Sequence, residues 1–475
     1  MDARPEFEGQ EGLIVVDGDE LRQAYEVADR LEDRGGQVVQ RYGRRVLVVD
    51  VPARAARGVA GLSAVRGYHR GALPRIPSKL DETERLGVRA WNLRQSAPYA
   101  AAKSERPLDG ARWDSEQPSG ALPPDGPGME HVAGAEPVGT FLFDDMSPYL
   151  IGSVAVGLVI VEGPSADLRF SDAERTKVAA EVQEGLSWLG SREPKASATF
   201  AYDIRTVRID AAPDPGLNGY EPLESRWRDP ALAKLGVPGG MLGVREYVAR
   251  IRRSLATRWG YMAFFTKYPV QHFAYALKPR LVMQYQNDGW GPDNIDRVFT
   301  HETGHIFGCP DEYAASNCSC TARAGYLREP NGNCERCAGS FTACLMAANT
   351  WAMCAHTPVH LGWRDTDGDG ALDPVDPLGN PLVDLGMLCS TFPFICQLLG
   401  LSPPPPPRTG ISAEIAGPAP AESVPLHLLR RVLDDEEMAR VEAAVVAEQR
   451  RYLEAVERKL RAAADALRRQ VPGAS

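Results

Sequence analysis

The chain has 475 residues, of which 44% are hydrophobic and 24% charged, a composition typical of a globular protein with two or three domains. Its formal net charge of −10 argues against a nucleic-acid partner, and no basic patch with interleaved aromatic residues is found. The longest apolar run, residues 385–401, is interrupted by Pro393 and Gln397, so we expect no membrane span.

Residues 1–72 are expected to form a small α/β domain. Apolar runs at 13–16, 38–39 and 46–49 predict strands, and apolar residues at helical spacing over 21–31 predict a helix. With a second helix and a last strand, the order is β-α-β-β-α-β, which is ferredoxin-like. Ahead of a further domain, this layout resembles a subtilisin-type propeptide; a binding or docking domain is the alternative.

Residues 73–137 are rich in Pro, Gly, Ser and Ala and are predicted to be a linker. Regular structure should return from residue 138, and one domain is expected to run to about residue 400. Its predicted elements are a buried strand at 154–161, a helix at 172–189, a strand at 199–209, a helix at 242–259 and strands within 261–286. The strand at 272–276 is a candidate edge strand for pairing with an extended peptide, with an interior strand as the alternative.

The most informative stretch follows at residues 301–311. On a helix, His301 and His305 lie one turn apart on the same face and can bind one Zn²⁺. Glu302 stands beside the first histidine, where it can take a proton from an activated water. Apolar residues over 295–307 predict a buried helix, with Asp293 as its N-cap.

The chain after this helix should return to the metal. Gly308 can end the helix in a left-handed turn, and Pro310 cannot continue it. Asp311 is therefore expected as the third ligand, and Glu312 is its competitor. Three protein ligands leave a fourth position open for water, as in catalytic zinc sites.

These residues resemble the metzincin clan of zinc metalloproteases, and aspartate as third ligand is similar to its snapalysin-type branch. The resemblance implies a zincin-like α+β catalytic domain, with a mixed sheet and an active-site helix. It also implies a Met-turn whose methionine lies beneath the metal: Met346 is the candidate and Met353 its competitor. A tyrosine after the Met-turn is missing, so a transition-state donor must lie elsewhere, and Tyr313 is one option.

All nine cysteines lie within residues 309–396. This clustering indicates irregular loops that are joined by disulfides, as in proteins of an oxidising compartment. The cysteine pattern, together with the calcium loop described below, favours an extracellular location. No signal peptide for ordinary secretion is visible, so the export route stays open. Cys309 is expected to be unpaired. The predicted disulfides are Cys344–Cys354 and Cys389–Cys396, while Cys318, Cys320, Cys334 and Cys337 form either two disulfides or a four-thiolate zinc site.

Residues 365–376 match a twelve-residue calcium-binding loop, with acidic residues at positions 1, 3, 5, 9 and 12 and glycine at position 6. The expected ligands are Asp365, Asp367, Asp369, Ala371, Asp373 and Asp376. Pro374 prevents the usual exit helix, so the loop is typical of extracellular calcium repeats. A solvated acidic turn is the alternative.

The C-terminal part is predicted to carry no chemistry. A Pro-rich linker at 401–420 precedes an amphipathic helical segment at 421–475, which either packs on the protein or self-associates.

The sequence thus predicts a zinc endopeptidase that acts on a peptide or protein substrate and also binds Ca²⁺. Its water would be activated by zinc bound to His301, His305 and Asp311, with Glu302 as general base. The alternatives are a non-catalytic metal-binding or interaction protein and a metal-dependent amide hydrolase for a non-peptide substrate.

Overall fold

This computed structural model describes residues 9–18, 20–115, 146–339, 341–366, 368, 370–375, 382–384, 423–425 and 440. The chain divides into two compact units. The first comprises residues 1–130 and 146–364, and the second comprises residues 131–145 and 365–475. We describe each unit by itself.

The N-terminal part of the first unit has the predicted β-α-β-β-α-β order. Its elements are β1 (Gly9–Val16), α1 (Leu21–Glu32), β2 (Gln37–Tyr42), β3 (Val46–Pro52), α2 (Ala56–Val59) and β4 (Val65–His69). The strands are antiparallel in the order β4-β1-β3-β2. Alternate apolar residues of these strands, among them Ile14 and Leu47, pack on Val27 and Leu31 of α1, so the predicted order of strands and helices is confirmed.

The prediction of a linker at 73–137 is wrong for its first half. Residues of that stretch form α3 (Glu82–Arg94) and α4 (Ala97–Ser104). Asp81 and Glu84 close a capping box at the start of α3, and Ser96 caps α4. Some of the small and proline residues that indicated a linker stand at the starts of helices. Gly87 allows close packing, because a Cβ at this position would meet the Tyr42 ring.

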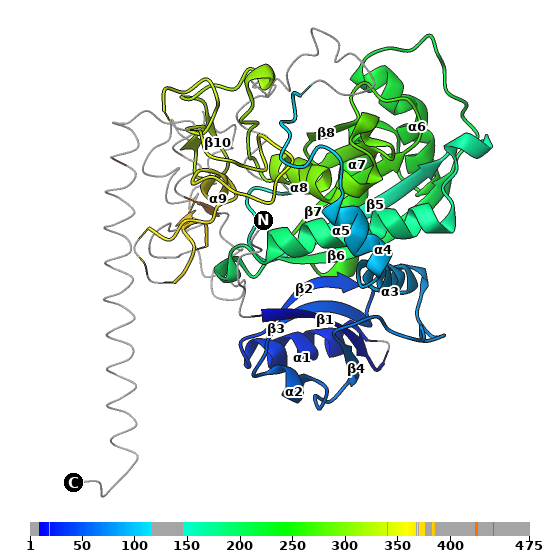
Figure 1. The fold of residues 1–475 in the computed structure, drawn as a ribbon, viewed down its shortest axis with the longest axis vertical. Helices are drawn as coiled ribbons and strands as arrows, with labels where there is room; N and C mark the ends of the chain where they lie inside the picture. Colours follow the sequence, from blue (N-terminus) through cyan, green and yellow to red (C-terminus); the bar gives the residue numbers. More distant parts are fainter. Residues whose placement is uncertain are drawn as a thin grey trace, which may run out of the picture. The chain divides into compact units, whose positions relative to one another are not determined.

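The remaining strands extend the same sheet. They are β5 (Ser153–Glu162), β6 (Thr199–Arg208), β7 (Trp259–Thr266), β8 (Ala274–Leu277) and β9 (Arg280–Gln284). The complete order is β4-β1-β3-β2-β6-β5-β7-β9-β8, and Figure 1 shows β2 beside β6. The parallel pairs are β2–β6, β6–β5, β5–β7 and β7–β9, whereas β8 is antiparallel to β9. Strands β1–β4 therefore share one sheet with β5–β9, and β8 is an edge strand as predicted.

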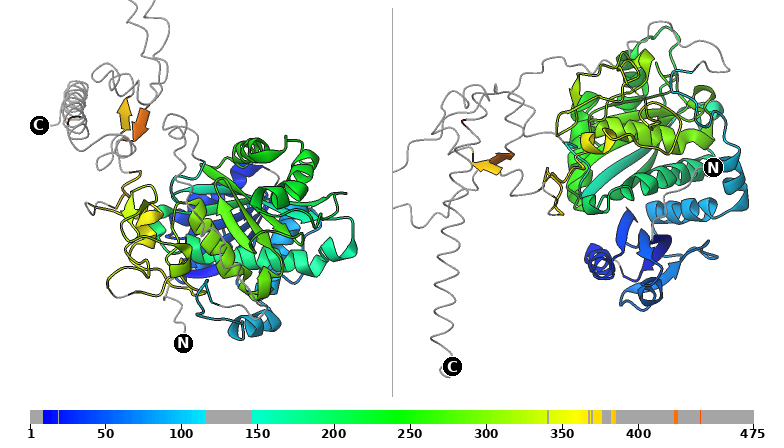
Figure 2. Two further views of the ribbon diagram at one scale, coloured as in Figure 1. Left: turned by 90° about the horizontal axis from the view of Figure 1, so that it is seen from above. Right: turned by 60° about the vertical axis from the view of Figure 1, so that its left-hand side comes forward.

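Helices cover both faces of this sheet and can be followed in Figure 2. One face carries α1, α6 (Tyr220–Lys234) and α7 (Gly240–Leu255), and the other carries α3, α5 (Asp172–Gly190) and α8 (Ile295–Ile306). Successive side chains of β7 point to opposite faces of the sheet and contact both helix layers. Phe264 packs on Trp227 of α6, and Phe265 stacks on Phe299 of α8. The unit is thus a mixed α+β fold with buried apolar layers above and below a large mixed sheet.

Short elements complete the first unit. They are the 3-10 turns η1 (Ala166–Leu168), η2 (Pro194–Ala196), η3 (Asn287–Gly289), η4 (Pro292–Asn294) and η5 (Ala314–Ser316), the pair β10 (Arg323–Ala324) and β11 (Glu329–Pro330), and α9 (Thr357–His360). None of the described helices is long and apolar enough to cross a bilayer.

In the second unit, β12 (Leu382–Asp384) pairs antiparallel with β13 (Ser423–Pro425). The predicted helical tail at 421–475 is therefore wrong at its start, where Val424 pairs with Val383. Of the rest of that tail only Arg440 is described, and it is helical. The Pro-rich linker at 401–420 and the Cys389–Cys396 pair lie outside the described residues.

Candidate metal centre

Helix α8 carries the two histidines and the glutamate of the motif. It begins one residue later than predicted, with Asn294 as its N-cap, because residues 292–294 form the 3-10 turn η4. The Asn294 amide donates to the carbonyl oxygens of Trp290 and Pro107. Asp293 is therefore not the cap, and its carboxylate forms an ion pair with Lys177.

Three ligand atoms converge beside this helix. The Nε2 atoms of His301 and His305 are 3.0 Å apart, and the Oδ1 atom of Asp311 is 3.2 Å from each of them. Zn–N and Zn–O bonds of about 2.0–2.1 Å at a tetrahedral angle place ligand atoms about 3.3 Å apart. The structure thus brings together the three predicted zinc ligands with the spacing that a tetrahedral ion requires.

The hydrogen bonds of the imidazoles fix which nitrogen faces this point. His301 Nδ1 donates to the carbonyl oxygen of Leu345 at 3.0 Å, and His305 Nδ1 donates to that of Cys309 at 2.7 Å. A carbonyl oxygen only accepts, so each Nδ1 carries a proton, and Nε2 is the ring nitrogen that faces Asp311. All three side chains are buried, and these residues could hold a metal ion between them.

Burial and the neighbouring charged groups shift the pKa values of these side chains. Burial lowers the pKa of His305, but Asp311 and Glu302 outweigh this effect and raise it to about 9. Burial raises the pKa of Asp311, but His305 and His301 hold it well below its ordinary value. Without a metal, a proton on His305 provides the missing positive charge. Zinc would have to displace that proton, so its binding should weaken at low pH.

Glu302 lies beside the ligands without any hydrogen bond to its Oε2 atom among the described residues. Burial raises the pKa of Glu302 above its ordinary value, while His305 and His301 lower it and Asp311 raises it. A buried carboxylate with a free oxygen next to a metal position can accept a proton from water.

A sharp turn after α8 directs Asp311 to the histidines. Gly308 has φ 95°, and the Cα atom of Gly325 is 2.9 Å from where a Cβ at position 308 would lie. Both facts require glycine there, as the sequence indicated. The next residue, Glu312, faces away from the centre, and its carboxylate accepts hydrogen bonds from Asn333 at 2.6 Å and Cys354 at 3.0 Å.

Met346 lies against α8, and its Sδ atom is 2.9 Å from where a Cβ at Gly304 would lie. Since Gly304 stands between the two histidines, Met346 packs against the helix that carries them, and its role as a Met-turn methionine stays a prediction. The predicted disulfide between Cys344 and Cys354 is wrong, because both are free thiols in the structure. They hydrogen-bond to the Thr357 hydroxyl instead, at 3.1 and 3.3 Å.

The stretch before residue 116 also reaches the centre, which the sequence did not indicate. The Trp113 ring packs on His301 with centroids 5.3 Å apart, and its Nε1 donates to Leu345 at 2.6 Å. The backbone of Trp113 donates to Ala347 at 3.1 Å, so this stretch is paired with the Met346 turn. Only the presence of tryptophan in a supposed linker hinted at this role.

The end of α4 holds the start of α8 through buried charges. Asp296 accepts two hydrogen bonds from Arg106, both at 3.1 Å, and forms an ion pair with Lys103 at 2.9 Å. Burial raises the pKa of Asp296, but Lys103 and Arg106 bring it below its ordinary value. These contacts fix the helix that presents the histidines.

Tyr313 lies close to the ligands. Burial, then the charges of Asp311 and Glu302, raise its pKa well above the ordinary value, so its hydroxyl stays protonated and can donate.

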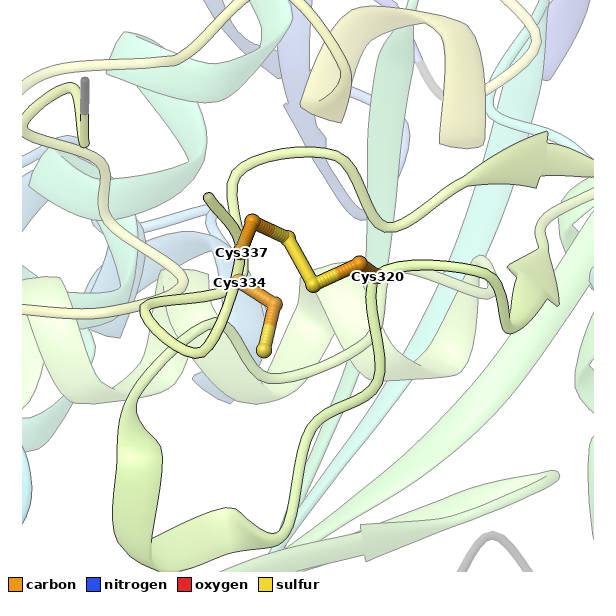
Figure 3. Close-up of side chains that lie close together, drawn as sticks. All are labelled: Cys320, Cys334 and Cys337. Atoms are coloured by element: carbon orange, nitrogen blue, oxygen red, sulfur yellow. A yellow bond between two sulfur atoms is a disulfide. The ribbon is translucent and has the colours of Figure 1, made fainter. Parts of the chain in front are cut away.

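The four remaining described cysteines form two disulfides, Cys318–Cys334 and Cys320–Cys337, which is one of the two predicted alternatives. Figure 3 shows the bonded pair Cys320–Cys337 with Cys334 beside it. A four-thiolate zinc site is therefore not formed, because bonded sulfurs cannot act as thiolates. Cys309 is a free, buried thiol, as expected.

The predicted calcium loop is described only in part, and Asp367, Asp369 and Asp376 lie outside the described residues. The Asp365 carboxylate accepts hydrogen bonds from the backbone of Gly368 at 2.8 Å and Gly370 at 3.1 Å. The Asp373 carboxylate accepts from the backbone and hydroxyl of Thr366 at 2.8 and 2.7 Å. Ala371 is described, and its ligand to calcium would be its backbone carbonyl oxygen. Because three of the expected ligands lie outside the described residues, calcium binding stays a prediction.

Among known proteins, no family model, no curated protein and no solved structure matches this chain.

Proposed function

We propose that this protein is a zinc-dependent endopeptidase of the metzincin type. The observation that carries the proposal is the convergence of His301, His305 and Asp311 on one buried point, with the free carboxylate oxygen of Glu302 beside it. A purely structural zinc site is normally closed by a fourth protein ligand and needs no neighbouring base. This arrangement therefore favours catalysis over a relict metal site.

Zinc in such a centre supplies Lewis acidity, which activates water and polarises the scissile carbonyl. Glu302 accepts the proton of the attacking water and returns it to the leaving amine. Tyr313 keeps its proton at neutral pH and provides a donor for the negative charge that develops on the carbonyl oxygen. Met346 supports the helix segment between the two histidines and so maintains their geometry.

A peptide rather than a small amide is favoured as substrate by the edge strand β8. This strand ends the nine-stranded sheet and packs near α8. An extended substrate can add to such an edge by main-chain hydrogen bonds, which would lead it past the zinc ligands. The order strand, helix, strand, then active-site helix, given by β5, α5, β6 and α8, also agrees with the metzincin layout.

Hydrolysis of a casein-type substrate by the full chain tests the proposal. We expect activity that a chelator abolishes and added Zn²⁺ restores. Hydrolysis that persists in the zinc-free protein, or cleavage of small amides but no protein, would contradict it.

A further inference from the structure

A second cluster of metal-binding side chains lies directly behind the candidate centre. Glu312, Cys344 and Cys354 each offer one ligand atom, and these atoms all lie within 4.8 Å of one another. The two cysteines are 0% and 4% exposed and Glu312 is 0% exposed, so solvent does not share the site. The chemistry proposed for the first centre uses none of these residues.

The polar atoms of this cluster form a compact group around the Thr357 hydroxyl. Its Oγ1 atom is 3.1 Å from the Cys344 sulfur, 3.3 Å from the Cys354 sulfur and 3.4 Å from Glu312 Oε1. The Cys354 sulfur is 3.0 Å from the same Glu312 oxygen. Zn–S bonds of about 2.3 Å and Zn–O bonds of about 2.0 Å at a tetrahedral angle place sulfur and oxygen about 3.5 Å apart. The three sulfur–oxygen distances of 3.1, 3.0 and 3.3 Å are thus within about 0.5 Å of the zinc-bound value.

The Glu312 carboxyl group also lacks an ion-pair partner among the described residues. Among the salt bridges of the described residues, none involves Glu312, and its other oxygen accepts only from the Asn333 amide at 2.6 Å. A fully buried carboxylate normally pairs with a cation or a metal. Soft thiolate sulfurs beside a carboxylate are typical ligands of Zn²⁺ rather than of Ca²⁺ or Mg²⁺.

We propose that Glu312, Cys344 and Cys354 bind a second, structural zinc ion, with the Thr357 hydroxyl as the fourth donor. Binding forms two Zn–S bonds and a Zn–O bond to the carboxylate, and the thiol protons leave to solvent. The ion joins the loop that carries Asp311 to the turn that carries Met346. A backbone hydrogen bond from Glu312 to the Met346 carbonyl, at 3.0 Å, already connects the same two segments.

Cobalt substitution tests this site separately from the first centre. Co²⁺ bound by thiolate gives a near-ultraviolet charge-transfer band, which a site made only of histidine and aspartate lacks. We expect the full chain, freed of metal with a chelator and kept under a thiol reductant, to show this band when Co²⁺ is added. Asp311→Ala should keep the band, because it removes a ligand of the other centre only. A reduced parent chain without the band would overturn the proposal.

Two variants locate the ligands. Cys354→Ser should remove most of the band and lower bound zinc by one equivalent per chain, whereas the matched control Cys309→Ser, another buried free thiol, should change neither. Where Cys354→Ser does not fold, Glu312→Gln keeps the shape of the site and should weaken cobalt binding by at least about tenfold. An undiminished band in either variant, or a native Cys344–Cys354 disulfide in peptide mapping, would contradict the proposal.

Discussion

The carboxylates of Asp311 and Glu312, which are neighbours in the chain, face opposite sides of one loop. Asp311 Oδ1 is 3.2 Å from the Nε2 atoms of both motif histidines, and Glu312 Oε1 is 3.0 Å from the sulfur of Cys354. Successive side chains of an extended segment point in opposite directions, so one residue serves each cluster.

From this relationship we expect Asp311→Ala and Glu312→Ala to affect hydrolysis differently. Asp311→Ala removes one of three expected zinc ligands. It should raise the free zinc concentration needed for half-maximal activity by more than the roughly 100-fold typical of losing a group that only supports a ligand. Glu312→Ala should raise this concentration by less than about tenfold. Activity measured in zinc buffers compares the two. The reverse order would assign the third ligand to Glu312.

Glu302→Gln should retain zinc but lose hydrolysis. The amide has nearly the shape of the carboxylate and leaves the ligands in place, yet it cannot accept a proton from water. The expected fall in kcat is about 10²–10⁴-fold. Metal analysis and kinetics on the same preparation check this, and full activity in a zinc-loaded Glu302→Gln protein would exclude the residue as the base.

Gly304→Ala should destabilise the protein through Met346. A Cβ at this position would lie 2.9 Å from the Met346 sulfur, so the methionine must move, at a cost of about 1–3 kcal/mol. In a Met346→Ala background the same change should cost less, because the clash is gone. Urea unfolding of the four proteins measures this coupling. Additive effects would show that the two residues do not interact.

His360 should make the protein less stable in acid. It is buried, its Nε2 donates to the Glu329 carbonyl at 3.1 Å, and its Nδ1 has no partner among the described residues. Burial lowers the pKa of His360 from 6.5 to about 4, although Glu329 opposes this effect. The unfolded chain therefore binds the proton first. The contribution of the neutral ring to the free energy of unfolding is fully present above pH 6.5. It is lost as the pH falls to 4, and the loss is at most about 3 kcal/mol.

His360→Gln tests this dependence. Unfolding free energies at pH 7 and pH 4.5 should be compared on zinc-free protein, since acid also protonates the zinc ligands. We expect the parent to lose more stability between the two pH values than the variant does. Identical losses would rule out His360 as the titrating group.

A chain that begins at residue 138 should fail to fold rather than gain activity. It would lack β2, whose Gln40 donates to the Gln183 carbonyl at 2.7 Å, and Arg94, which pairs with Glu184 at 2.6 Å. It would also lack Trp113 beside His301. Circular dichroism and protease sensitivity report the outcome. A folded and more active product would instead support an inhibitory propeptide.

Local spacing explains what the sequence could predict. His301, Glu302 and His305 share one helix, and Asp311 follows after a turn fixed by Gly308, so predicting the candidate metal ligands needed no long-range information. The ferredoxin-like order of residues 12–70 could be predicted for the same reason.

Contacts between distant segments could not be predicted. The packing of Trp113 on His301 and the pairing of β2 with β6 depend on the tertiary structure alone. The helices α3 and α4 were missed because Ala, Ser, Pro and Gly are also frequent in linkers. The positions of Cys344 and Cys354 on either side of the Met346 turn suggested a disulfide. The sequence could not show that Thr357 and Glu312 form hydrogen bonds with these thiols.

The junction of β2 with β6 also has a consequence for how this chain reaches its native state. Pairing Gln40 with Phe200 closes a loop of roughly 160 residues, with an entropy cost of about 4.5 kcal/mol before the contact gives any return. The N-terminal module with strands β1–β4 can form from local contacts as it leaves the ribosome. Its strand β2 remains an unpaired edge strand until β6 has been synthesised. The interval between these two events is the period in which the nascent protein is most exposed to aggregation.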